Sequence, residues 1–103
     1  MQTYRATEFT GTRAWKALDI ERISDATVRL HWTDQPYEWH INDGPEVFAV
    51  LDGSVDMHIR IDGREEVIRL EVGDVFHAAN GDEHVAHPVG IVRILVIERA
   101  GSI

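Results

Sequence analysis

The stretch Trp39–Gly53, WHINDGPEVFAVLDG, decides the fold and carries the first half of a candidate site. Its first half holds His40, Asn42 and Glu46, and its second half is a short apolar run over residues 46–51. Glycine and proline just before this run, and glycine just after it, are typical of the turns that bound a buried strand. The stretch therefore predicts a buried strand with polar, chemically active side chains at its start.

A second stretch, Gly73–Pro88, reads GDVFHAANGDEHVAHP and brings three histidines close together in the sequence. Asn80-Gly81 within it is typical of a two-residue type I′ hairpin turn. Such a turn would place His77 directly opposite His84, with their Cβ atoms about 5 Å apart. A four-residue turn would keep His77 and His84 on the same face, with their positions shifted by one step along the strands. A three-residue loop would put them on different faces.

Alternating apolar and polar residues predict strands along most of the remaining chain. In residues 27–33, for example, Val28, Leu30 and Trp32 share one face and polar residues share the other, as in a half-buried strand. Asp62-Gly63 predicts a hairpin between the strands on either side of it. The further expected strands lie within 14–23 and at 46–51, 55–61, 66–72, 75–79 and 91–98.

About eight short strands with turn residues between them, and no helical stripe, predict an all-β antiparallel sandwich or barrel. The length of 103 residues suits a single domain over 1–103. We expect an irregular arm or edge strand over 1–12 and the barrel over 13–99. Trp15, Trp32, Phe48 and Phe76 are expected in a dry core, and Trp39 at the rim of a pocket.

Composition narrows the classes of function. Eighteen acidic residues against ten basic ones give a formal charge of −8, which disfavours nucleic acid and anionic membranes as partners. The absence of cysteine leaves only nitrogen and oxygen as metal ligands. No apolar leader and no run of about 20 apolar residues is visible, so we expect a cytoplasmic protein without a membrane span.

The polar residues of the two stretches suit a metal ion. His40 and Glu46 offer one imidazole and one carboxylate, and the second stretch must supply another histidine. Two imidazoles and a carboxylate with open positions suit zinc, iron, manganese or nickel. His31, His58 and His87, on polar faces or in a loop, are expected to be solvated.

At this point the spacing resembles that of a known family. H-x-N-x3-E-x6-G from His40 to Gly53, followed by G-x5-A-x-G-x2-H from Gly73 to His84, is similar to the two motifs of the cupin superfamily. Together with the closing VRILVIERAG, the chain looks like the small cupins related to the metal-binding domain of some sugar-phosphate isomerases. The resemblance covers roughly residues 26–101 and implies a cupin double-stranded β-helix, a jelly-roll barrel.

The resemblance places the family's metal ligands on His40, Glu46 and His84. Asn42 stands where the family usually has a second histidine, and an amide oxygen is a weaker ligand. His77 could replace the missing histidine if it lies opposite His84. Two further departures are Ala79 in place of the motif proline and Pro88 in place of the motif asparagine.

Two classes of function follow from this site. One is a divalent-metal-binding cupin with a pocket for a small polar molecule, acting as a metal-dependent isomerase or oxygenase. The other is a non-catalytic small-molecule binding or sensor module with a vestigial metal site. The strand expected at 91–97 has apolar residues on both of its faces. We therefore also expect a homodimer that covers one side of the sheet.

Overall fold

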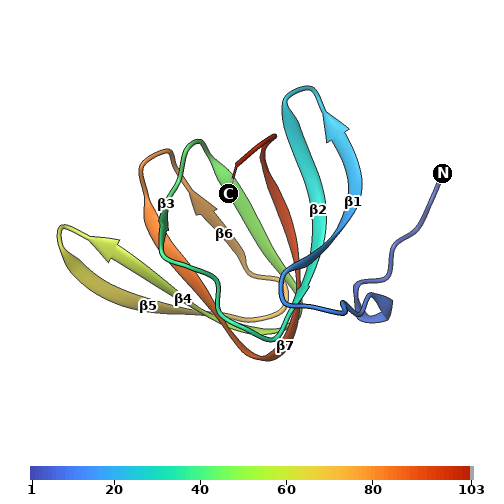
Figure 1. The fold of residues 1–103 in the computed structure, drawn as a ribbon. Coiled ribbons are helices and arrows are strands. Elements are labelled where there is room, and N and C mark those ends of the chain that lie inside the picture. The colour runs from blue at the N-terminus through green and yellow to red at the C-terminus, as the bar shows by residue number, and fades with distance from the viewer. Residues whose placement is uncertain (103) are drawn as a thin grey trace.

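The computed structural model describes residues 1–102, so the last residue of the expected 1–103 domain lies outside the described residues. The chain forms an antiparallel sheet of seven strands that curves into a jelly-roll barrel (Figure 1), which confirms the predicted all-β fold. Among the described residues, no helix is long and apolar enough to cross a membrane. The elements are a 3-10 helix η1 (Ala6–Glu8) and strands β1 (Lys16–Ile23), β2 (Ala26–Thr33), β3 (His40–Ile41), β4 (Glu46–Ile61), β5 (Arg64–Leu70), β6 (Val75–Ala78) and β7 (Glu83–Arg99).

The two long strands β4 and β7 form the centre of this sheet. The strand order is β1-β2-β7-β4-β5, while β3 pairs with β7 and β6 pairs with β4. The strands expected at 46–51 and 55–61 are one strand, because the chain does not reverse at Asp52-Gly53. The register between β4 and β7 instead shifts there, as at a β-bulge, and the strand bends.

Gly53 makes this bend possible. Its φ is +80°, and a Cβ atom at this position would lie 2.5 Å from the carbonyl oxygen of Ile91. Only glycine combines a positive φ with such a close approach of the neighbouring backbone.

The Asp62-Gly63 hairpin is confirmed. Both residues have positive φ, 52° and 76°, as a type I′ turn requires. Ile61 pairs with Arg64, and the β4–β5 hairpin extends from there. Here the local turn chemistry alone fixes the register of two strands.

The predicted Asn80-Gly81 hairpin is wrong. Of its two central residues only Gly81 has a positive φ, which is the pattern of a type II turn rather than type I′. β6 pairs with β4 and not with β7. The turn is held from outside, because the Gly81 N–H donates to the Asn42 carbonyl (2.8 Å) and the Asn42 N–H donates to the Asp82 carbonyl (2.9 Å).

The two faces of β2 are inverted relative to simple hydrophobic patterning. Arg29 and His31 lie opposite Val96 and Ile94, and the last two belong to the buried core. Residues directly opposite each other in antiparallel strands share a face. The polar face of β2 therefore points into the barrel.

The apolar face of β2, with Leu30 and Trp32, points outward and is nevertheless buried. The N-terminal arm accounts for the burial of Trp32, because a Cβ atom on Gly11 would lie 2.9 Å from the Trp32 ring. The Arg93 guanidinium fixes the arm by donating to the Phe9 carbonyl at 3.0 Å. The arm thus covers surface that the sequence pattern assigned to the core.

The core itself occupies the inner faces of β4 and β7. Phe48 is buried as expected, and Trp15 and Phe76 pack against the core while remaining partly exposed. Its fully buried members include Val50, Val55, Met57, Val92 and Ile94.

We predict that Gly53→Ala lowers the free energy of unfolding by about 3 kcal/mol, because it adds a backbone clash to the strain of positive φ. Gly63→Ala is the matched control, since its φ is +76° and no atom of residues 1–102 lies within 4 Å of the added Cβ. We expect a loss of about 1–2 kcal/mol there. Urea unfolding of the three proteins measures both values, and equal losses would show that the Ile91 contact costs nothing.

Candidate metal centre

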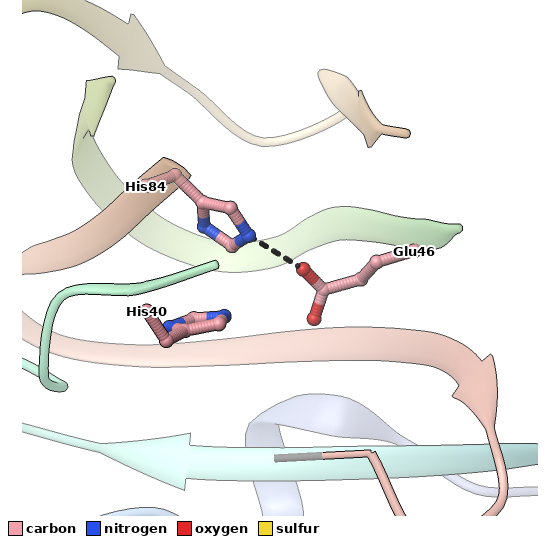
Figure 2. A group of neighbouring side chains, drawn as sticks. All are labelled: His40, Glu46 and His84. Carbon is pink, nitrogen blue, oxygen red and sulfur yellow. Dashed lines mark ion pairs between the residues drawn. The ribbon is translucent and has the colours of Figure 1, made fainter. Parts of the chain in front are cut away.

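Three side chains from three separate strands converge at one point in the structure. His40 comes from β3, Glu46 from the first position of β4, and His84 from the start of β7. Figure 2 shows the carboxylate approaching from the side opposite the two imidazoles. Each residue offers one ligand atom, and these atoms all lie within 4.8 Å of one another. This is a spacing that one bound ion can span.

The strand registers explain this convergence. His40 pairs directly with His84 in the β3–β7 ladder, and their ring centroids are 4.4 Å apart. Glu46 and His84 are 9% and 3% exposed, so both are removed from water. Burying a carboxylate beside imidazoles is costly unless a charge or hydrogen bonds compensate it.

His40 is oriented as a metal ligand usually is. Its Nδ1 lies 3.0 Å from the Glu38 carbonyl oxygen, to which it can only donate. A proton held at Nδ1 leaves the Nε2 lone pair free. The backbone therefore sets the tautomer that a metal requires.

His84 has a different environment. Its Nε2 lies 2.8 Å from the Asn42 Oδ1 and 3.1 Å from the Glu46 Oε1. Its Nδ1 is buried and has no hydrogen-bond partner among the described residues. The Glu46 Oε1 is likewise buried and, apart from its ion-pair contact with His84, has no hydrogen-bond partner among the described residues. A buried carboxylate oxygen without a hydrogen-bond partner, close to two imidazoles, is an arrangement that a divalent ion could occupy.

Glu98 faces Glu46 across the β4–β7 ladder, so two carboxylates lie close together here. Burial alone would raise the pKa of Glu46, but His84, together with Glu98 and His40, lowers it. Burial and the neighbouring Glu46 raise the pKa of Glu98 to about 7. Near neutral pH, Glu46 is ionised while Glu98 holds a proton for part of the time.

The three side chains open onto a pocket of about 200 Å³. Tyr37 stands at its rim, with its ring edge-on to His40 at 5.5 Å. Trp39, expected at the rim, is not among the lining residues and instead stacks on the Arg60 guanidinium at 3.9 Å. The lining residues beyond the three are Trp15, Arg29, His31, Tyr37, Phe48, Ala86, Val96, Glu98 and Ser102.

His77 is not brought to this site. It pairs with Val47, whereas its neighbour Ala78 pairs with Glu46. Because neighbouring residues of a strand point to opposite faces, His77 lies on the other face from Glu46, where it is exposed. The expected position opposite His84 is wrong, because β3 occupies the pairing positions on β7 that the hairpin would have used.

Several pocket residues were missed by reasoning from sequence. His31 was expected to be solvated, yet it lines the pocket because the polar face of β2 points inward. Glu98 lies an even number of residues from Val92, Ile94 and Val96. Because side chains alternate along a strand, the sequence pattern already predicted that Glu98 shares their inward face. Arg29 and Tyr37 carried no comparable signal.

Comparison with solved structures identifies the fold. A cupin-2 domain protein from Shewanella frigidimarina is 26% identical, with a TM-score of 0.76, covering 86% of this chain and 84% of that one. A cupin superfamily protein from Desulfitobacterium hafniense has a TM-score of 0.77 at 13% identity, covering 91% and 85%. A structure of Fe(II)-HppE with an alternative substrate has a TM-score of 0.71 at 12% identity, covering 95% and 60%.

No protein-family model and no curated protein sequence matches the chain. The structural likeness nevertheless extends over most of this chain and most of the two cupin proteins. The chain therefore has the fold of a small cupin domain, as its two motifs indicated.

Burial lowers the pKa of His31 below its usual 6.5. A hydrogen bond with the Trp15 backbone opposes this shift, Arg29 adds to it, and Glu46 and Asp19 oppose it more weakly. The folded chain thus binds this proton less readily than the unfolded chain. The resulting stability is complete above pH 6.5 and is lost as the pH falls toward the folded pKa, by at most about 1.4 kcal/mol per pH unit.

We therefore predict that His31→Gln loses less stability than the wild type between pH 7.5 and 5.5. Urea unfolding at both pH values measures this difference, and NMR titration of the ring protons, assigned with the variant, locates the His31 midpoint. Identical losses in both proteins, with a midpoint at 6.5 or above, would contradict the assignment.

Proposed function

We propose that the chain is a divalent-metal-binding cupin whose pocket admits a small polar molecule beside the metal. The observation that carries this proposal is the convergence of His40, Glu46 and His84 around a buried carboxylate oxygen without a hydrogen bond. These three would hold the ion, and the Asn42 Oδ1 would be a weaker fourth ligand. His77 has no part in this set because it lies on the other face of the sheet.

The donor set indicates which ions fit. Two imidazoles and one carboxylate, with open positions facing a pocket, form the facial set used for non-haem iron(II), and zinc, manganese and nickel accept the same donors. The similarity in fold to Fe(II)-HppE supports a divalent metal here. When bound, the ion supplies Lewis-acid chemistry to an oxygen of the bound molecule.

The chain's own residues would prepare the site for this chemistry. The Glu38 carbonyl fixes the ring of His40, and Glu46 supplies the negative charge that attracts a cation. Phe48 and Tyr37 line the pocket with apolar surface that limits water. Glu98 holds or releases a proton near pH 7 next to the pocket. On this basis the catalytic form of the proposal is a metal-dependent isomerase or oxygenase.

A second candidate is a non-catalytic binding or sensor module. The observation that favours it is the 2.8 Å contact between the His84 Nε2 and the Asn42 Oδ1, which satisfies part of the polar cluster without a metal. The pocket would then bind its small molecule directly. The expected homodimer and cytoplasmic location are compatible with either candidate.

We predict stoichiometric divalent metal in the purified wild-type protein and its loss in His40→Ala and in His84→Ala. His77→Ala is the matched control, because it removes an exposed histidine from the opposite face and should leave metal content unchanged. Elemental analysis after dialysis measures all four proteins. Metal-free wild type that cannot be reconstituted would exclude the metal-binding candidate and leave the binding module, while turnover assays on the loaded protein separate catalysis from binding.

Asn42→Asp tests the fourth ligand with almost no change in shape. A carboxylate oxygen is a better ligand than an amide oxygen, so we expect metal affinity to rise by roughly tenfold or more, about 1.4 kcal/mol. Competition with a chromophoric chelator measures the affinities. An unchanged affinity would mean that the side chain of residue 42 does not reach the ion.

A further inference from the structure

A second pair of histidines lies on the outer face of the same β4–β7 ladder. His58 of β4 and His87 of β7 have ring centroids 4.1 Å apart, with their planes inclined by 37°. We propose that these two imidazoles form a separate binding site for a divalent transition-metal ion of the zinc, nickel or copper class. This site is independent of the proposed metal centre within the barrel.

The ladder register places the two rings side by side. Asp56 pairs with His87, and His58 pairs with Val85, so the two histidines are diagonal neighbours on one face. Diagonal positions are within reach of each other for long side chains. Both residues are partly exposed, which leaves room for water to complete the coordination of an ion.

His58 is oriented for ligation by a carboxylate. Its Nδ1 lies 3.0 Å from the Glu65 Oε1 on the neighbouring strand β5. A ligating histidine usually donates its other N–H to such an acceptor, which fixes the ring and raises the basicity of the free nitrogen. The Nε2 of His58 is therefore the nitrogen available to a metal, beside the ring of His87.

The surrounding charges favour a cation. Asp56, opposite His87, accepts two hydrogen bonds from the Arg69 guanidinium, whose Nη1 also lies 3.7 Å from Glu71. Arg60, opposite Glu65 on the same face, pairs with Glu83, so four carboxylates stand against the two positive charges of Arg60 and Arg69. This local excess of negative charge lowers the energy of a bound dication.

The donor chemistry selects the class of ion. Two neutral imidazoles suit zinc, nickel and copper, whereas magnesium and calcium require oxygen ligands. The nearby carboxylate oxygens already bind His58 and Arg69. They therefore orient the histidine ring and attract a cation, and they do not supply the shell of oxygen ligands that magnesium or calcium requires.

The outer site and the inner one share a strand without sharing a ligand. His84 and His87 are three residues apart on β7 and therefore project from opposite faces of the sheet. A substitution at one site leaves the ligands of the other in place. Zinc titrations of matched variants can therefore count the two sites separately.

The experiment titrates metal-stripped protein with Zn²⁺ alone by calorimetry, in the full chain. If both sites bind, the wild type takes two zinc ions, and His58→Ala or His87→Ala removes one of them or weakens it at least tenfold. His77→Ala, which removes an exposed histidine without a neighbouring imidazole, should leave both. The His40→Ala/His84→Ala double variant should retain the outer ion, and Mg²⁺ should not displace it.

The outcomes separate this site from the inner one. A wild type that binds one zinc, lost in His58→Ala and kept in His84→Ala, supports the outer site while excluding the inner one. Zinc binding that is the same in wild type, His58→Ala and His87→Ala overturns the outer site, whatever the inner one does. Circular dichroism of each variant verifies folding, and the single variants at exposed positions keep the test valid even if the double variant does not fold.

Discussion

The backbone pairing of β4 with β7 is the constraint on which the rest of the structure depends. This ladder runs along most of both strands and sets Glu46 opposite Glu98 and Ile59 opposite His84. Its bend at Gly53 lets one pair of strands form both the hydrophobic core and the wall of the pocket. Because side chains alternate along each strand, the same ladder also places His58 and His87 together on the outer face.

The polar cluster around Glu46 is costly to bury. A buried carboxylate, two imidazoles and an amide lie together where water is largely excluded, and three of their polar atoms have no hydrogen-bond partner among the described residues. Groups buried in this way destabilise a fold unless a charged partner compensates them. A bound cation would satisfy the Glu46 carboxylate, whereas without one the contact of His84 with Asn42 provides only partial compensation.

The pocket depends on an inversion of the usual patterning. The barrel interior receives Arg29 and His31, so part of it is polar and can receive a small molecule. The apolar side chain of Trp32 on the opposite face would then face water, but the N-terminal arm packs against it and Arg93 holds the arm there. Because the arm keeps Trp32 out of water, β2 can turn its polar face toward the barrel interior without exposing this ring.

The sequence by itself determined those features that depend on local chemistry and spacing. The two motifs predicted the cupin fold and placed His40, Glu46 and His84, which do converge. Asp62-Gly63 predicted its hairpin correctly, because a type I′ turn is set by the φ preferences of its own two residues.

Tertiary structure alone decided the remainder. The pairing of β6 with β4 left His77 outside the site, because backbone groups pair with whichever strand lies beside them and not with the nearest one in sequence. Likewise, alternation shows that a strand has two faces without showing which one is inside. The register of β2 against β7 settled that for β2, because it puts His31 opposite Ile94 and so into the pocket.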